Sequence, residues 1–259
     1  MSNVIYGALA AALILGAGSG AYYLAHDSGQ RAVLGDDLCR SDQPLAAHSI
    51  TLLDSSDALS SEEQEIVRDA VDADAAAASP YEKVSVLAVE ASQPYAPNRL
   101  FSACAPKRGA DAQGVSENPA LYEAIWKHRF RGPLDKAIAG ELASSSQDAS
   151  PLVETIWAVS RLPDFGPAIG RRRLDIVSDM LQLSAGYSQY HSHLSYARYA
   201  RTEFGRLRVP NLRGVHVVIH YLMRPKTLDL QTSAHVRFWE DFFRAAGASK
   251  VDVVGGPAS

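Results

Sequence analysis

Residues 51–60, TLLDSSDALS, join an apolar run to a small cluster of acidic and hydroxyl side chains. The stretch 48–54, HSITLLD, has the length and apolar content of a buried strand. Residues 60–78 follow with apolar side chains at helical spacing, with Ser60 or Ser61 as N-cap. A strand leading directly into a helix is typical of an α/β fold. The polar cluster therefore lies at the carboxyl end of a strand, where it caps the helix, binds a cation or supplies a nucleophile.

The rest of the chain continues this alternation. Strands are predicted at 83–90, 98–104, 174–179, 215–222 and 250–254, and helices at 118–144, 151–161, 190–207 and 232–246. The first of these helices is expected to break near Gly132 and Pro133. The link between the strands at 83–90 and 98–104 is too short for a helical crossover, so these strands should pair antiparallel. The pattern predicts a Rossmann-like α/β domain, with a mostly parallel central sheet, one antiparallel edge strand and helices on both faces.

Size and charge limit the classes of function. The 259 residues are enough for one large α/β domain or two small ones. The net charge is −4 and no basic stripe occurs, which argues against nucleic acid as the main partner, because phosphate binding needs clustered lysine and arginine. No HExxH, Walker A or GxSxG motif is present. The sequence therefore offers no standard enzyme motif.

Residues 4–25, VIYGALAAALILGAGSGAYYLA, contain no charged side chain. An apolar segment of this length is sufficient to span a bilayer, and Tyr22 and Tyr23 fit an interfacial aromatic belt. A cleaved signal peptide is the alternative, but it usually has a basic segment and a shorter apolar core. We expect a transmembrane helix as anchor over 1–25, a linker over 26–47 and a folded domain over 48–259.

The two cysteines, Cys39 and Cys104, bear on the location of that domain. In an exported domain they would form a disulfide, whereas in the cytosol both would stay reduced. Cys104 could instead act as a thiol nucleophile, but a disulfide with Cys39 is the simpler interpretation. Few charged residues flank the apolar segment, so the positive-inside rule does not decide its orientation in the membrane. The expected location is the bacterial inner membrane, with a single span and the domain in the periplasm.

Oxygen-bearing side chains gather at three predicted strand or loop ends. The first group is 54–57, DSSD; the second lies in DASPL, 148–152, before a helix; the third is SDM, 178–180, after a strand. In open α/β sheets, ligands bind beyond the carboxyl ends of the strands. Each residue taken singly is also a common cap, as Ser150 would be for the helix beginning at residue 151.

With these residues the chain resembles the von Willebrand factor A (vWA) domain family. The resemblance covers roughly residues 48–254. That family has an Asp-x-Ser-x-Ser motif after the first strand, a threonine before a later helix and an aspartate at the end of the fourth strand. Asp54 and Ser56 match the first and third motif positions, while Ser150 and Asp179 stand where the threonine and the distal aspartate are expected.

The chain departs from the family motif at one place. Ala58 occupies the fifth motif position and has no side-chain oxygen, whereas Asp57 is an extra carboxylate next to it. The resemblance implies a divalent cation, Mg²⁺ with Mn²⁺ or Ca²⁺ as alternatives, because such ions take carboxylate and other oxygen ligands. The implied metal ligands are Asp54, Ser56, Asp57, Ser150 and Asp179.

The resemblance also implies a function that is not enzymatic. We expect a membrane-anchored protein-interaction module that accepts a partner's carboxylate at an open position of the metal, within a larger cell-envelope assembly. One alternative is a metal-dependent hydrolase that uses the same carboxylates, which would need a second metal or a general base. The other is a degenerate structural domain that binds no metal.

Overall fold

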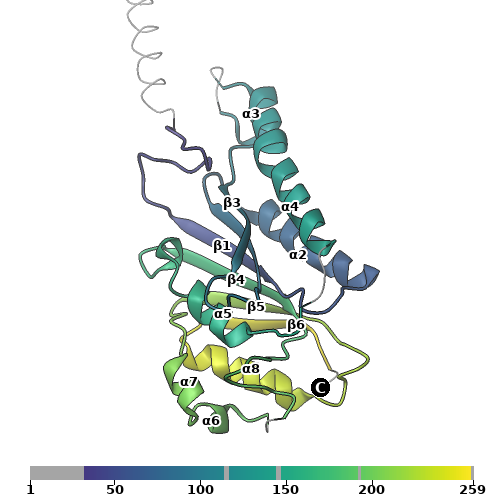
Figure 1. Ribbon diagram of the computed structural model, residues 1–259. Coiled ribbons are helices and arrows are strands. Elements are labelled where there is room, and N and C mark those ends of the chain that lie inside the picture. The colour runs from purple at the N-terminus through teal and green to yellow at the C-terminus, as the bar shows by residue number, and fades with distance from the viewer. Residues whose placement is uncertain (1–31, 114–116, 144–146, 192–193, 258–259) are drawn as a thin grey trace, which may run out of the picture.

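A six-stranded sheet organises the molecule (Figure 1). The computed structural model describes residues 32–257 except 114–116, 144–146 and 192–193. The strands are β1 (Ala47–Leu53), β2 (Lys83–Ala88), β3 (Asn98–Cys104), β4 (Arg171–Ser178), β5 (Val215–Tyr221) and β6 (Lys250–Gly255). Their order is β3-β2-β1-β4-β5-β6, and every neighbouring pair is parallel except β2 and β3. The predicted α/β class and the antiparallel edge strand are confirmed.

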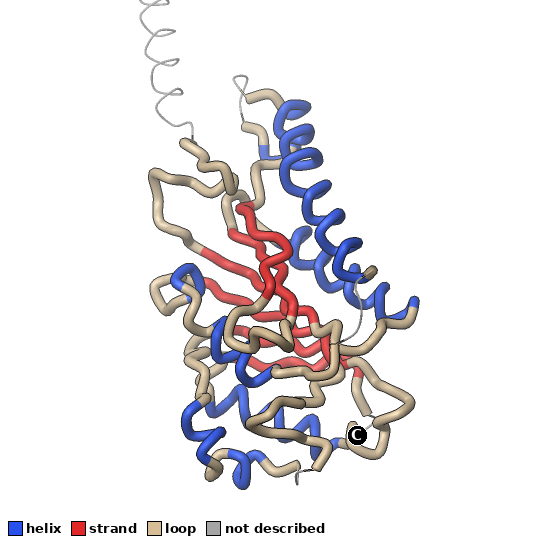
Figure 2. Tube along the Cα trace, viewed as in Figure 1, coloured by secondary structure: helices blue, strands red, loops and turns tan. Residues whose placement is uncertain are grey.

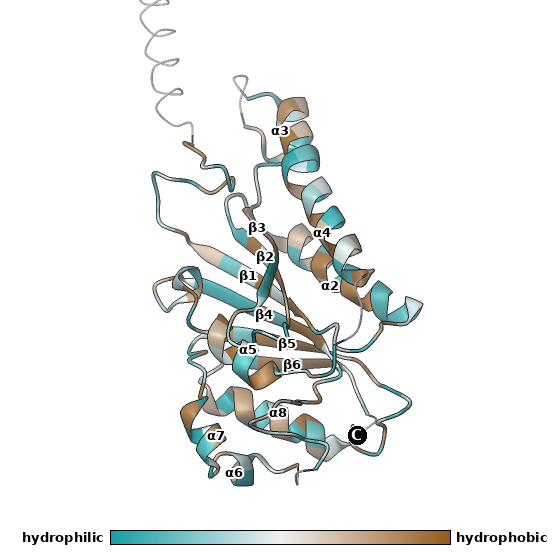
Figure 3. Cartoon of the chain, in the orientation of Figure 1, coloured by the Kyte–Doolittle hydropathy of each residue, from teal (hydrophilic) through white to brown (hydrophobic). Residues whose placement is uncertain are grey.

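Helices lie on both sides of this sheet (Figure 2). They are α2 (Ser61–Ala77), α3 (Pro119–Ile125), α4 (Gly132–Leu142), α5 (Leu152–Val159), α6 (Tyr196–Tyr199), α7 (Glu203–Leu207) and α8 (Ser233–Ala245). Short 3₁₀ turns occur at Gly109–Asp111 and Pro163–Phe165. Figure 3 shows both hydrophobic and hydrophilic residues on α2, α4 and α8, as expected for helices with one buried face.

Two hydrophobic cores hold the layers together, one on each face of the sheet. Ile50 and Leu52 belong to the core that also contains Trp239 of α8, whereas Leu53 belongs to the core with Val71 of α2. Successive side chains of a strand point to opposite faces, so β1 is buried on both. Each fully buried large apolar side chain contributes about 1.5–3 kcal/mol to folding. Burial on both faces therefore holds the central strands in place, and this sets the positions at which the loops at their carboxyl ends begin.

The predicted break near Gly132 and Pro133 is wrong. A π-helical turn, Trp126–Arg131, joins α3 to α4 without interruption. In this turn the Gly132 N–H bonds the Lys127 carbonyl, one residue further back than in an α-helix. The wider turn leaves room for the ring of Pro133, which would otherwise clash with the preceding turn.

The single helix predicted at 190–207 is also wrong, because within the described part of this segment only α6 and α7 are helical. The Thr202 hydroxyl accepts the Gly205 N–H and begins α7 as its N-cap. Tyr199 of α6 lies against Phe238 of α8, with ring centroids 5.4 Å apart. The segment folds over the aromatic side chains of α8, and this packing replaces one continuous helix.

The residues before β1 are attached to the domain by a disulfide between Cys39 and Cys104. Leu38 is only 2 % exposed and joins the core under α2, and the Cys104 N–H donates to the Asp37 carbonyl at 2.8 Å. The predicted anchor over 4–25 lies outside the described residues. Among the helices of the described ranges, none is long and apolar enough to cross a membrane.

Candidate functional site

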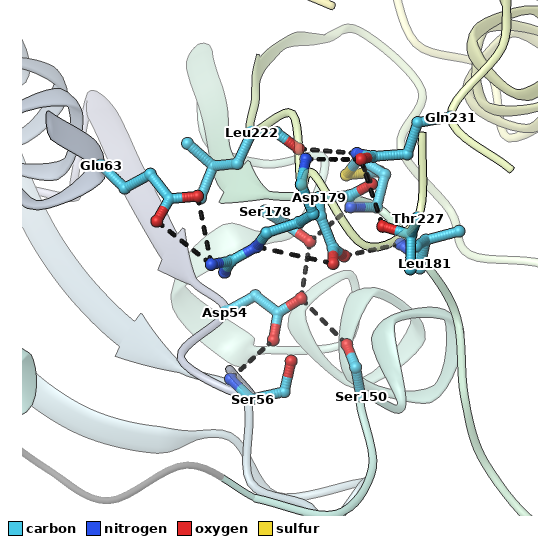
Figure 4. Close-up of polar contacts among 12 residues, drawn as sticks. Asp54, Ser56, Glu63, Ser150, Ser178, Asp179, Leu181, Leu222, Thr227 and Gln231 are labelled. Atoms are coloured by element: carbon cyan, nitrogen blue, oxygen red, sulfur yellow. Dashed lines mark hydrogen bonds and ion pairs between the residues drawn. The ribbon is translucent and has the colours of Figure 1, made fainter. Parts of the chain in front are cut away.

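The strand order reverses between β1 and β4, and open α/β sheets bind ligands at such a reversal. Asp54 directly follows β1 and Asp179 directly follows β4, so their carboxyls lie at one rim of the sheet (Figure 4). We call Asp54, Ser56, Asp57, Ser150 and Asp179 the rim cluster. A hollow of about 100 Å³ is bordered by four of the five, Ser56, Asp57, Ser150 and Asp179. The fifth, Asp54, is buried and accepts the hydroxyl of Ser150, which borders the hollow.

Asp54 is the most completely bonded member of the rim cluster. It is 3 % exposed. Its Oδ2 accepts the hydroxyls of Ser150 at 2.9 Å and Ser178 at 2.6 Å, and its Oδ1 accepts the Ser56 N–H at 3.2 Å (Figure 4). Hydrogen bonds to a charged group contribute about 1.5–3 kcal/mol each. These bonds fix the orientation of the carboxylate and join three separate segments of the chain around it.

Helix capping accounts for Ser60 but not for Ser150. Ser60 caps α2: its hydroxyl accepts the Glu63 N–H, while the Ser60 N–H donates to the Glu63 carboxylate. The alternative that Ser150 caps α5 is wrong, because the N-cap is Pro151 and has no side-chain bond. The Ser150 hydroxyl is directed to Asp54 instead.

Asp179 is 3 % exposed, and its Oδ1 accepts the Leu181 N–H at 2.9 Å. Burial, followed by the charge of Asp54, raises the pKa of Asp179 to about 7. The next residue, Met180, has a left-handed φ of 62°, which is strained for a side chain of this size. The Trp239 indole N–H donates to the Met180 carbonyl at 2.8 Å and holds this conformation. A cation beside Asp179 would favour its charged form.

Asp57 and Ser56 form the outer side of the hollow. Asp57 is exposed, and Ser56 is partly buried. The structure thus brings all five predicted residues to one rim. Tyr190 also borders the hollow, and burial, followed by the charge of Asp179, raises its pKa to about 12.

Arg224 is not among the residues predicted from the sequence; it follows β5 and its side chain is 12 % exposed. Its Nη1 lies 3.1 Å from both carboxylate oxygens of Glu63 and donates to the Ala58 carbonyl at 3.3 Å. Its Nε lies 3.8 Å from the Asp179 Oδ2. The available signal was an arginine at the end of an apolar strand. The sequence pattern places Ser178 at a strand end beside Asp179 but does not predict its bond to Asp54.

The donor set fits a hard divalent cation only in part. Two carboxylates and the serine hydroxyls are oxygen ligands of the kind that Mg²⁺ takes, and water completes such sites. Within the described ranges no point brings together three side chains from His, Cys, Asp and Glu in a way that could hold a metal. The hydroxyls of Ser56 and Ser150 would therefore have to be true ligands. Ala58 adds no side-chain oxygen, and its carbonyl already accepts from Arg224.

Comparison with known proteins assigns no family to the chain. No family model matches it, and no curated protein matches it in sequence. The geometry of the rim cluster is therefore the basis on which a function is chosen.

Proposed function

We propose that this chain is a vWA-like protein-interaction domain, which binds an acidic side chain of a partner through a divalent cation held by the rim cluster. The observation that carries the proposal is the environment of Asp54. A buried carboxylate receives bonds from Ser56, Ser150 and Ser178 and lies beside a second carboxylate, Asp179. Helix capping requires none of these contacts, whereas a cation site requires oriented oxygen atoms.

The strand order and the antiparallel β3 agree with the resemblance to the vWA family. In that arrangement Mg²⁺, or Mn²⁺ or Ca²⁺ in its place, would be held by Asp54, Ser56, Asp57, Ser150 and Asp179. The bound cation would supply positive charge at an open coordination position, where a partner's aspartate or glutamate completes the shell. Binding would then need no basic surface on this chain.

We propose in addition that the domain is anchored in the bacterial inner membrane by residues 4–25 and lies in the periplasm, within a larger envelope assembly. The uncharged segment supports the anchor, and the Cys39–Cys104 disulfide supports an oxidising compartment. The partner is a protein and not a nucleic acid, because the net charge is −4.

Site-specific photo-crosslinking in intact membranes tests the interaction. A photoreactive residue at Tyr190, which borders the hollow, should crosslink a partner protein, and a divalent-cation chelator should abolish the product. Ser56→Ala should reduce the yield several-fold, since it removes a proposed ligand. Ser55→Ala is the matched control, because its hydroxyl bonds Glu141 and is not a proposed ligand. Equal yields from both variants, with no effect of the chelator, would contradict the proposal.

A further inference from the structure

We infer that Arg224 sets the affinity of the rim cluster for divalent cations, because its guanidinium competes with the cation for Asp179. The inference rests on the proposed function and names the residue that regulates its metal step. The two edges of the Arg224 guanidinium differ in their contacts. One edge of the guanidinium is well bonded, through Nη1, to Glu63 and the Ala58 carbonyl.

The other edge of the guanidinium faces Asp179. The Arg224 Nε is buried and has no hydrogen-bond partner, although the Asp179 Oδ2 lies 3.8 Å away. A buried N–H without an acceptor costs free energy. A movement of about 0.9 Å would bring it to an ordinary N–H···O distance. Arg224 is therefore close to a second arrangement in which it bonds Asp179 directly.

Glu63 opposes this movement. Its carboxylate is fixed in place by the capping box of α2, in which the Ser60 N–H donates to it at 2.8 Å. The guanidinium is thus shared between a carboxylate on α2 and a carboxylate of the rim cluster. When it moves to Asp179 it neutralises a proposed metal ligand. When it stays with Glu63, its Nε remains 3.8 Å from the Asp179 Oδ2 and makes no hydrogen bond to it, so that oxygen is less fully neutralised.

The position of Arg224 also relates to the departure of the chain from the vWA motif. The Ala58 carbonyl accepts from Arg224, at the motif position where a hydroxyl is expected. The positive charge of Arg224 therefore lies between the Ala58 backbone and the proposed metal ligand Asp179, whose Oδ2 is 3.8 Å from the Arg224 Nε. Positive charges a few ångströms apart repel even in water, so removing the guanidinium charge should strengthen cation binding by roughly tenfold or more.

Calorimetric titration with Mg²⁺ and Mn²⁺ tests the inference, using the full chain purified in detergent. Arg224→Gln should bind either ion about tenfold more tightly than wild type. Arg224→Lys keeps the charge and should bind much like wild type. Arg244→Met is the matched control, because it removes one positive charge from an exposed position of α8, and should leave the affinity unchanged.

The outcomes separate the inference from the proposed function. If wild type and Arg224→Gln bind the ions equally, the inference is overturned while the metal site stands. If neither binds and both are folded by circular dichroism, the metal site itself fails and the inference fails with it. Glu63→Gln provides a second test should Arg224→Gln not fold. It releases Arg224 toward Asp179 and keeps an acceptor for the Ser60 N–H, so binding should weaken several-fold; unchanged or tighter binding would overturn the inference.

Discussion

Removal of the Cys39–Cys104 disulfide should destabilise the domain by about 4 kcal/mol, because the bridge restricts the unfolded chain. The two cysteines are 65 residues apart in the sequence. For a closed loop of that length the chain-entropy relation gives about 14 cal/mol/K, which corresponds to about 4 kcal/mol at 25 °C. The folded-state contacts of the bridged segment, such as buried Leu38, do not depend on the sulfur–sulfur bond. The change therefore acts mainly through the unfolded state.

Urea unfolding of residues 32–259 measures this effect. The variant Cys39→Ser/Cys104→Ser should unfold at a lower urea concentration than the oxidised parent, with an equal or slightly steeper slope. The parent treated with a reductant is the control and should match the double variant. A loss of less than about 1 kcal/mol in both would refute the loop-closure reasoning.

Three further predictions concern pH and metal binding. Burial lowers the pKa of His235 to about 4, so the unfolded state binds more protons below pH 6.5. Stability should fall by roughly 3 kcal/mol as the pH decreases through that range, and by less in His235→Gln, measured by urea unfolding. Asp74 acts in the opposite direction, because burial and the charge of Asp175 raise its pKa to about 6. Its favourable contribution is lost as the pH rises from 3.8 through 6, so Asp74→Asn should gain stability relative to wild type over that range. Ala58→Ser restores the missing hydroxyl at an exposed position and should tighten Mg²⁺ binding several-fold in calorimetry; unchanged affinity would contradict this role.

Most of the sheet could be predicted, because strands buried on both faces give continuous apolar runs. The strand 98–104 and its antiparallel pairing follow from the short link before it. The start of β4 was harder to predict, because the strand begins at Arg171, three residues before the predicted start at 174. The three consecutive arginines at 171–173 have no apolar pattern, yet Arg172 donates to the Phe165 carbonyl and Arg173 to Asp175 inside the fold. A hydrophobic pattern does not reveal the hydrogen-bond acceptors that allow an arginine to lie inside the fold.

The candidate site divides in the same way. Asp54 and Asp179 could be predicted, because both follow strands and parallel strands end at one rim. Arg224 could not be predicted as a member of the site, because its contacts with Glu63 and Asp179 depend on the path of the loop after β5. That path is held in part by the Gln231 side chain, which accepts from the Arg224 N–H and donates to the Leu222 carbonyl.

The central claim is that the rim cluster binds a divalent cation, and anomalous scattering from crystals grown with Mn²⁺ tests it most directly. Mn²⁺ serves as a detectable substitute for Mg²⁺, and both wild type and Arg224→Gln should be measured. We predict one strong peak about 2 Å from side-chain oxygens of the rim cluster, with higher occupancy in the variant. Well-ordered crystals of both proteins without a peak at this rim would contradict the claim.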